Sequence, residues 1–176
     1  MAPNQRFSAS GRKRRSADAP PPDPRTARAA ALALAARRDY TAAELERKLT
    51  DRGYEAETIA TALAGLRDSR VVDDRRVALA HVRTARAIKG RGRVRIAREL
   101  AARGLGRDLI DEALSGIEPG DELASIRRIL TRKRWPANPS RADRQRMFRH
   151  LFARGFPADA IGKALGGRED DHDEEP

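Results

Sequence analysis

Apolar residues in the middle of the chain recur with a spacing of four, and three segments share one longer pattern. In each segment an apolar pair is followed by a glycine, then by an apolar or aromatic residue, and then by a second apolar pair. The three copies are Leu45, Leu49, Gly53, Tyr54, Ile59 and Leu63; Ile96, Leu100, Gly104, Leu105, Ile110 and Leu114; and Met147, Leu151, Gly155, Phe156, Ile161 and Leu165. Every position is displaced by 51 residues from one copy to the next. A fixed period near fifty residues indicates a tandem array of structural units.

Each copy predicts two helices joined by a tight turn. Apolar residues four apart lie on one face of a helix. The glycine follows a basic residue at the end of the first helix, where it can adopt the left-handed conformation and form a Schellman cap. In that cap the residue that follows the glycine packs against the residue four positions before the glycine. The corresponding pairs are all apolar: Leu49 with Tyr54, Leu100 with Leu105, and Leu151 with Phe156.

A further helical stretch precedes each pair, over residues 29–38, 74–89 and 121–134. The first pair also begins with a capping box, Thr41-x-x-Glu44. No alternating strand pattern is present. One repeat holds too few large apolar residues to complete a core alone, so neighbouring repeats should stack. We therefore predict an all-α protein in which three tandem three-helix repeats, over residues 29–72, 73–117 and 118–167, form an elongated, curved array.

The two ends of the chain differ in composition from the repeats. Residues 1–28 are rich in proline, include the basic run Arg12-Lys13-Arg14-Arg15 and carry a net charge of +5. Residues 168–176 hold six carboxylates against one arginine, a net charge of −5. Neither end has enough apolar surface to offset its ordering entropy. We expect a disordered basic arm and a disordered acidic tail.

Composition narrows the class of protein further. The chain has no cysteine, which excludes disulfides, a thiolate nucleophile and a Cys-ligated zinc. It has no apolar run that would predict a transmembrane span or a signal peptide, so we expect a cytoplasmic protein with no membrane partner. Among 176 residues, 37 Lys and Arg face 26 Asp and Glu, giving a formal net charge of +11. Such an excess favours a polyanionic or acidic partner.

The positive charge is concentrated in the second and third repeats. The first repeat has no net charge, whereas the second and third carry +5 and +6. No acidic residue lies between Asp74 and Glu99. The candidate binding residues form two basic clusters: Arg83, Arg86, Lys89, Arg91, Arg93, Arg95 and Arg98 in the first, and Arg127, Arg128, Arg132, Lys133, Arg134 and Trp135 in the second.

These two clusters predict contact with nucleic acid. Cations at helix ends and on a flexible loop, such as the one over residues 89–93, can follow a phosphate backbone. The indole of Trp135 can stack on a base. The alternative interpretation is that the arginines are solvated helix faces enlarged by Arg-rich codon usage, with Trp135 packed beneath a helix end.

The sequence contains no constellation typical of catalysis or metal binding. His81 is expected to pack on the apolar face of its helix, His150 lies among arginines, and His172 lies in the tail between two aspartates. A tail is a poor setting for a preformed metal site. Asp73 and Asp74 suit a helix N-terminus, where carboxylates cap the helix. With no nucleophile–base pair and no phosphate-binding glycine motif, we predict a protein that is not an enzyme and needs no cofactor or metal.

Parts of all three repeats carry a pattern known from one family. The most specific stretch reads Val72-Asp73-Asp74-x3-Ala78, then Gly92-x3-Ile96-x2-Glu99-Leu100-x3-Gly104-Leu105. The opening Tyr40-Thr41-x2-Glu44-Leu45 and the closing Leu151-x2-Arg154-Gly155-Phe156 fit the same pattern. In these residues, over about 29–167, the chain resembles the RecX regulatory proteins, whose fold is three tandem three-helix units. That family commonly has aromatic residues at the positions of Val77 and His81, so we expect looser packing in the second repeat.

The resemblance implies a function. Proteins of the RecX family bind the RecA recombinase in the deep groove of its filament on single-stranded DNA. There they restrain filament growth, ATP hydrolysis and strand exchange, and they also bind DNA with modest specificity. An elongated basic body suits that groove, and we expect a monomer that contacts RecA and single- or double-stranded DNA through the two basic clusters.

Two other functions compete with this expectation. The first is general nucleic-acid binding, in which the second helix of each pair reads a DNA groove. Those helices, over residues 55–66, 107–115 and 157–165, hold few basic residues, which disfavours groove reading. The second is a protein–protein scaffold without a DNA role, which predicts no polynucleotide binding at low salt.

Overall fold

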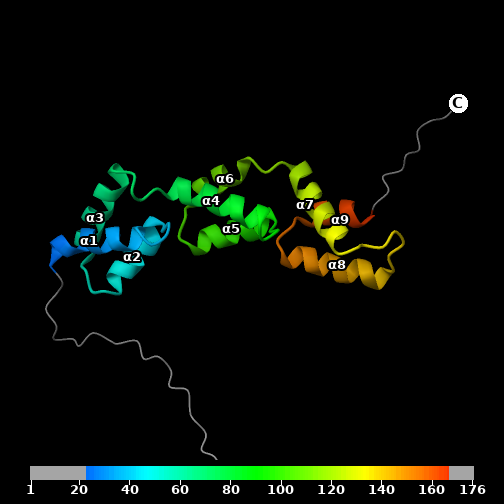
Figure 1. The fold of residues 1–176 in the computed structure, drawn as a ribbon, viewed down its shortest axis with the longest axis horizontal. Helices are drawn as coiled ribbons and strands as arrows, with labels where there is room; N and C mark the ends of the chain where they lie inside the picture. The colour runs from blue at the N-terminus through cyan, green and yellow to red at the C-terminus, as the bar shows by residue number, and fades with distance from the viewer. Residues whose placement is uncertain (1–22, 167–176) are drawn as a thin grey trace, which may run out of the picture.

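The structure is a computed structural model that describes residues 23–166. Within this range the chain forms nine helices and no strand. The helices are α1 (Pro24–Ala35), α2 (Ala42–Thr50), α3 (Ala56–Asp68), α4 (Asp74–Ala87), α5 (Arg93–Ala102), α6 (Arg107–Ser115), α7 (Pro119–Arg132), α8 (Arg141–Ala153) and α9 (Ala158–Gly166). They group in order into unit 1 (α1–α3), unit 2 (α4–α6) and unit 3 (α7–α9) (Figure 1). The predicted all-α fold of three three-helix units is confirmed.

Each unit has a hydrophobic core of its own. The first and third helices of a unit pack against each other, and the second helix packs against the third. The repeated apolar positions supply a large share of the buried side chains in all three cores. They are Leu45, Leu49, Ile59 and Leu63 in unit 1, Ile96, Leu100, Ile110 and Leu114 in unit 2, and Leu151, Phe156, Ile161 and Leu165 in unit 3. Three separate clusters, and not one continuous core, therefore stabilise the array.

The predicted Schellman caps are present at the ends of α2, α5 and α8. Gly53, Gly104 and Gly155 all have left-handed φ angles, of 84°, 85° and 84°. The amide of the next residue donates to the carbonyl four residues before the glycine in each case: Tyr54 to Leu49 at 3.2 Å, Leu105 to Leu100 at 3.3 Å, and Phe156 to Leu151 at 3.3 Å. A side chain at these glycines would strain the backbone, which explains the repeated glycine.

The first helix begins earlier than predicted. The Asp23 side chain accepts a hydrogen bond from the Arg25 amide at 2.9 Å and starts α1 at Pro24, and Ala27 is fully buried. The prediction that residues up to 28 are disordered was therefore wrong for residues 24–28, because a capping aspartate and a buried alanine continue the helix. The rest of the predicted arm, residues 1–22, and the predicted tail, 168–176, lie outside the described residues.

Two other predicted helices have different ends. The stretch predicted over 74–89 ends at Ala87, and Ile88, the residue just beyond it, is 77% exposed. The stretch predicted over 121–134 runs from Pro119 to Arg132. Val77 and Ala78 are nevertheless buried, so the loss of an aromatic residue at position 77 leaves that part of α4 packed.

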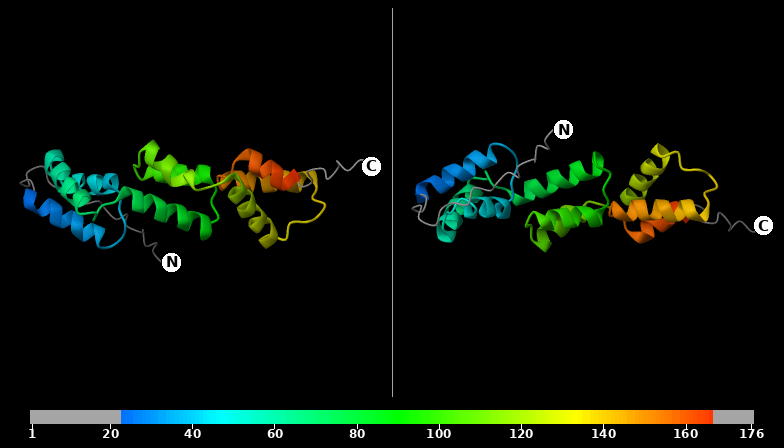
Figure 2. Two further views of the ribbon diagram at one scale, coloured as in Figure 1. Left: turned by 90° about the horizontal axis from the view of Figure 1, so that it is seen from above. Right: turned by 90° about the horizontal axis from the view of Figure 1, so that it is seen from below.

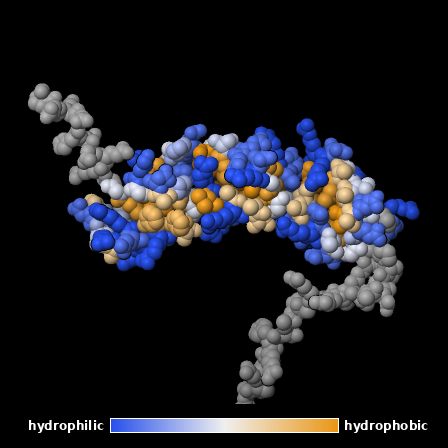
Figure 3. Space-filling view, turned by 180° about the vertical axis from the view of Figure 1, so that it is seen from behind, coloured by the Kyte–Doolittle hydropathy of each residue, from blue (hydrophilic) through white to orange (hydrophobic). Residues whose placement is uncertain are grey.

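The three units follow one another along a single long axis. Figures 1 and 2 show an elongated array whose bending in these views is slight, with the first and last described residues at opposite ends. On the face shown in Figure 3, apolar patches lie between hydrophilic side chains along the whole length. In the described range, no helix combines the length and the apolar character needed to cross a membrane.

Candidate functional site

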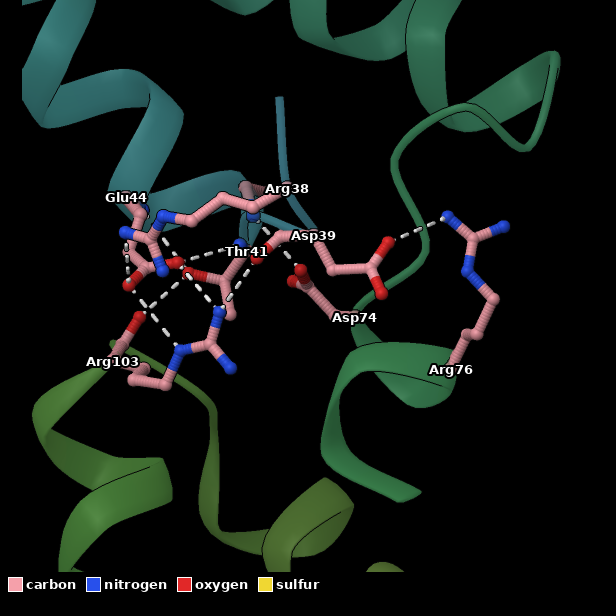
Figure 4. Close-up of polar contacts among 8 residues, drawn as sticks. Arg38, Asp39, Thr41, Glu44, Asp74, Arg76 and Arg103 are labelled. Carbon is pink, nitrogen blue, oxygen red and sulfur yellow. Dashed lines mark hydrogen bonds and ion pairs between the residues drawn. The ribbon is translucent and has the colours of Figure 1, made fainter. Parts of the chain in front are cut away.

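Units 1 and 2 meet where the end of α5 reaches the start of α2, a contact we call the first junction (Figure 4). The Arg103 guanidinium donates to the Glu44 carboxylate, with Nη2 2.8 Å from Oε2, and to the Asp39 carbonyl at 3.0 Å. The Arg103 carbonyl in turn accepts from the Thr41 hydroxyl at 2.7 Å. Thr41 and Glu44 also form the predicted capping box of α2. The same residues therefore begin a helix and dock the next unit.

Two carboxylates complete the first junction. Asp74, in the first turn of α4, accepts from the Ala42 amide at the start of α2, at 2.8 Å. Asp39 pairs with Arg76 at 3.6 Å (Figure 4). Asp73 caps α4 by accepting from the Arg76 amide at 2.8 Å, so the interpretation of Asp73 and Asp74 as helix-start residues is confirmed.

The charge of Glu44 is stabilised by its partners. Burial raises the pKa of Glu44, but hydrogen bonds from Arg103 and from the Thr41 backbone outweigh that effect and hold the pKa below its usual range. Glu44 and Arg103 side chains are only 17% and 18% exposed, so solvent screens this pair less than a surface ion pair. The Glu44–Arg103 pair therefore belongs to the structural framework.

Units 2 and 3 meet through backbone hydrogen bonds, in a contact we call the second junction. The Gly92 amide donates to the Arg154 carbonyl at 2.9 Å, and the Val94 amide donates to the Gly155 carbonyl at 3.1 Å. A Cβ atom at Gly92 would overlap the Gly155 carbonyl, so the chains approach too closely for a side chain there. The loop over residues 89–93 was predicted to be flexible. It is instead packed against the end of α8.

The two junctions follow the same 51-residue register. Arg103 donates to the Asp39 carbonyl in the first junction, and Arg154 donates to the Gly90 carbonyl at 3.4 Å in the second. The amides of Ala42 and Arg93 also correspond, but the carboxylates that accept from them do not keep the register: Asp74 accepts from Ala42, and Glu122, which lies 48 residues after Asp74, accepts from Arg93 at 2.9 Å. The array is therefore built by one docking mode used twice.

The start of α8 differs from the starts of α2 and α5. Ser140 accepts from the Asp143 amide at 3.1 Å, and its hydroxyl donates to the Asp143 carboxylate at 2.6 Å. Thr41 caps α2 from within unit 1 in a similar way, but its hydroxyl also donates to the Arg103 carbonyl of the next unit, whereas Ser140 and Asp143 bond to each other within unit 3.

The Glu99 carboxylate interacts with three basic side chains beside the second junction. Its carboxylate pairs with Arg91, with Arg95 at 3.1 Å, and with the His81 Nε2 at 2.9 Å. Burial raises the pKa of Glu99, but the hydrogen bonds from these three side chains outweigh it and lower that pKa. His81 is thus half-buried with a carboxylate partner, where simple apolar packing was predicted.

Glu122 has the opposite electrostatic character. It is 4% exposed, and its Oε2 atom has no hydrogen-bond partner among the described residues. Desolvation raises the pKa of Glu122, and the Arg93 amide and the Arg86 charge only partly oppose this shift. The second junction therefore contains a carboxyl group that resists ionisation.

The first predicted basic cluster does not act as one surface. Arg86 pairs with Asp121 at 3.4 Å, Arg91 pairs with Glu99, and Arg95 bonds both Glu99 and the Ala153 carbonyl. Arg86 and Arg95 reach residues of unit 3, whereas Arg91 is held within unit 2 by Glu99. Within residues 23–166 the other side chains of the cluster are exposed and form no ion pair; we call them the unpaired cations, Arg83, Lys89, Arg93 and Arg98.

A basic groove of about 500 Å³ lies between α4 and α6. Arg75, Arg76, Arg83 and Arg86 line it together with apolar residues such as Leu79 and Val82. Arg75 pairs with Glu112 at 2.6 Å, and Arg76 and Arg86 are paired as described above. Arg83 is therefore the groove arginine without an acidic partner in the described part of the chain.

The second predicted cluster ends in a packed tryptophan. Arg127, Arg132, Lys133 and Arg134 are exposed without an acidic partner among residues 23–166, and Arg128 donates to the Ser125 hydroxyl at 3.0 Å. Trp135 packs against the core of unit 3 and its amide closes α7 by donating to the Leu130 carbonyl at 3.0 Å. This packing supports the structural interpretation of Trp135 over the stacking one.

Two exposed aromatic residues were missed in the sequence. Phe148 and Phe152 lie four apart on α8, 36% and 58% exposed, beside Arg144 and Arg149. Their i, i+4 spacing on a helix face beside the one that carries the buried Leu151 is the signal that would have found them. No group of three or more residues that could hold a metal ion occurs within residues 23–166. The predicted tail histidine, His172, lies outside that range.

Known protein families match the two segments that meet at the first junction. Profiles of the first and second three-helix domains of RecX match residues 27–66 and 73–114. The regulatory protein RecX of Halorhodospira halophila is 38% identical over 152 residues, 85% of this chain and 92% of that protein. The RecX of Chromobacterium violaceum is 39% identical over 148 residues, 82% of this chain and 91% of that protein.

Solved structures share the fold. A crystal structure of a regulatory protein RecX superposes with a TM-score of 0.73 at 22% identity, covering 82% of this chain and 73% of that one. RecX from Lactobacillus salivarius gives a TM-score of 0.70 at 20% identity, covering 81% of this chain and 94% of that one. With two family domains matched in order and relatives 38% and 39% identical over most of the chain, the chain belongs to the RecX family of regulatory proteins.

Proposed function

We propose that this protein is a negative regulator of the RecA recombinase. It binds in the groove of the RecA filament on single-stranded DNA and restrains filament extension, ATP hydrolysis and strand exchange. Membership of the RecX family supports this function, and the relatives are named regulatory proteins. The protein acts in the cytoplasm without catalysing a reaction.

The observation that carries the proposal is the distribution of exposed cations over a long, narrow body. Units 2 and 3 present Arg83, Lys89, Arg93 and Arg98, and then the exposed basic residues at the end of α7, along one elongated array. Residues 29–72, which make up most of unit 1, have no net charge. We infer that units 2 and 3 contact acidic RecA surface and DNA phosphates, because clustered cations favour both partners.

General groove reading is less well supported. The second helix of the central pair, α6, exposes Asp108, Asp111 and Glu112 beside its single arginine, Arg107. An acidic helix is repelled by a phosphate backbone, so α6 is unsuited to enter a DNA groove. The unpaired cations on α4 and α5 are better placed to contact nucleic acid.

The test measures DNA-dependent ATP hydrolysis by RecA and filament length on single-stranded DNA, with this protein at a substoichiometric ratio. Wild-type protein should lower both. Replacing the unpaired cations Arg83 and Arg98 with alanine should weaken inhibition, because each substitution removes an exposed charge that forms no ion pair in the described chain. The matched control is Arg37→Ala with Arg67→Ala, which removes two exposed cations from unit 1.

The control keeps the result interpretable. Both double variants lose the same charge, so the difference in inhibition reports position and not net charge. Equal inhibition by the two variants would contradict the proposal that the exposed cations of unit 2 contact RecA or DNA. No inhibition by the wild-type protein at any ratio would remove the proposed RecA function.

A further inference from the structure

The outer face of α8 holds two aromatic rings that the fold does not use. Phe148 and Phe152 stack with their centroids 6.1 Å apart and their planes 12° apart. Phe152 is 58% exposed, and neither residue belongs to the buried core of unit 3. Exposing two phenylalanines on one helix face opposes the hydrophobic effect, so this pair calls for a partner.

Every other aromatic side chain between residues 23 and 166 has a structural role. Tyr40 lies under the Arg38 guanidinium, 4.0 Å from its ring centroid, and the Tyr54 hydroxyl is 2.7 Å from the Thr26 hydroxyl. Trp135 and Phe156 pack in unit 3. Phe148 and Phe152 are therefore the aromatic residues of the described chain that remain available to a ligand.

Arginines surround the exposed rings. A shallow groove of about 380 Å³ is lined by Arg144, Gln145, Phe148 and Arg149 of α8 and by the end of α9. Arg144 and Arg149 have no acidic partner within residues 23–166, and α8 also exposes Arg141. We call this surface, Arg144, Phe148, Arg149 and Phe152, the α8 platform.

We propose that the α8 platform binds single-stranded nucleic acid by stacking unpaired bases on Phe148 and Phe152 while Arg144 and Arg149 contact the phosphates. A single strand offers flat base faces and negative charge together, which is what aromatic rings flanked by arginines recognise. A duplex hides its base faces, and an acidic peptide offers charge with nothing for the rings. This inference rests on the part of the proposed function that brings the protein to single-stranded DNA.

The test separates stacking from apolar docking. Fluorescence anisotropy measures the affinity of the full chain for a labelled oligothymidylate, with wild type, Phe152→Leu and Phe152→Trp. Leucine keeps the apolar area and loses the ring, so the affinity should fall about tenfold, the effect of one stacked base. Tryptophan keeps a ring and should stay within about twofold of wild type or bind more tightly.

Two controls make the result specific. Ile88→Ala removes an apolar side chain that is 77% exposed on another unit, and it should leave the affinity unchanged. An oligomer with the same phosphates and no bases should bind wild type and Phe152→Leu equally. Thermal unfolding of each variant checks that the fold is intact, which is expected because residue 152 is exposed.

The outcomes distinguish this inference from the proposed function. If wild type binds the oligomer and Phe152→Leu binds equally well, the stacking role is wrong while RecA regulation stands. If polyglutamate competes with the labelled oligomer as strongly as unlabelled oligothymidylate does, charge alone drives the binding and the platform binds an acidic protein instead. If wild type binds no single-stranded DNA, both the platform and the DNA contact of the proposed function fail.

Discussion

At the scale of single residues, three glutamates with similar surroundings behave differently. Glu44 and Glu99 each meet arginine side chains, and their pKa values fall below the ordinary value of 4.5. Glu122 meets one backbone amide, and desolvation raises its pKa. The number of direct hydrogen bonds from cationic side chains therefore decides whether a buried carboxylate is stabilised as an anion.

The three glutamates give opposite pH dependences. A carboxyl with a lowered pKa contributes stability above pH 4.5, and this contribution is lost as the pH falls through its lowered value. Glu122 has a raised pKa, so its contribution is fully present below 4.5 and is lost as the pH rises through its raised value. Glu44 and Glu99 thus favour the folded chain at neutral pH, and Glu122 opposes it.

We predict that Glu122→Gln is more stable than wild type at pH 7, by about 1 kcal/mol, and loses this advantage at pH 4. Glutamine keeps the oxygen that accepts from the Arg93 amide and removes the buried charge. Urea unfolding at both pH values measures the difference. Exposed Glu57→Gln is the control, and equal behaviour of the two variants would show that Glu122 is not desolvated as described.

At the scale of helices, glycine allows α5 to dock on α8. Gly92 and Gly106 both precede a helix, α5 and α6, and neither caps it with a side chain. Their surroundings differ, because a Cβ at Gly92 would overlap Gly155, whereas a Cβ at Gly106 would meet nothing within 4 Å. Both glycines precede a helix, but only at Gly92 does the contact between units leave no room for a side chain.

We predict that Gly92→Ala destabilises the chain by about 1–3 kcal/mol, because the extra methyl forces the second junction apart. Gly106→Ala should destabilise the chain by no more than about 0.5–1 kcal/mol, because alanine is a poorer N-cap than glycine but meets no neighbouring atom there. Urea unfolding gives both values, and hydrogen exchange of the Val94 amide should accelerate in Gly92→Ala alone. Equal effects of the two substitutions would contradict the close approach of α5 and α8.

At the scale of the whole molecule, three cores are joined by polar junctions. The hydrophobic clusters of units 1, 2 and 3 share no residue. Hydrogen bonds and ion pairs carry the contacts between them, and these contribute less than a continuous core. In an array of this kind each unit is stabilised by its own core and by its contacts with adjacent units, so the chain does not unfold in a single cooperative step.

We predict that a core substitution unfolds mainly its own unit. Leu45→Ala, at a fully buried position, should destabilise unit 1 by about 2–5 kcal/mol. Hydrogen exchange should then accelerate in α1–α3 and stay unchanged in α7–α9. Ile126→Ala, also fully buried, should give the reverse pattern, and a uniform loss of protection in either variant would show a single cooperative core.

The local rules of the chain were sufficient to predict most of the fold. The 51-residue pattern, the Schellman glycines and the Thr41–Glu44 capping box depend on residues within a few positions of one another, so they can be recognised without coordinates. The start of α1 was missed because its first turn lies in a proline-rich segment. The predicted ends of α4 and α7 were each two residues too long at the C-terminus, since charge and helix propensity continue past the last helical residue.

The basic surface could not be predicted in the same way. Counting charges placed Arg83 to Arg98 in one cluster, but Arg91 and Arg95 are held by Glu99, and Arg86 by Asp121 in the next unit. Arg95 also reaches Ala153, a residue far away in the sequence. Neither periodicity nor net charge contains that information.

The sequence by itself determined the number of units, their helices and the turns between them, because these follow from local hydrogen bonds and from the period of apolar side chains. Only the tertiary structure decided which arginines dock one unit on the next and which remain exposed. It also left Phe148 and Phe152 uncovered on α8. The physical reason is that the contacts between units join residues far apart in the sequence, such as Arg86 with Asp121 and Arg103 with Asp39, and these residues meet only when the units stack.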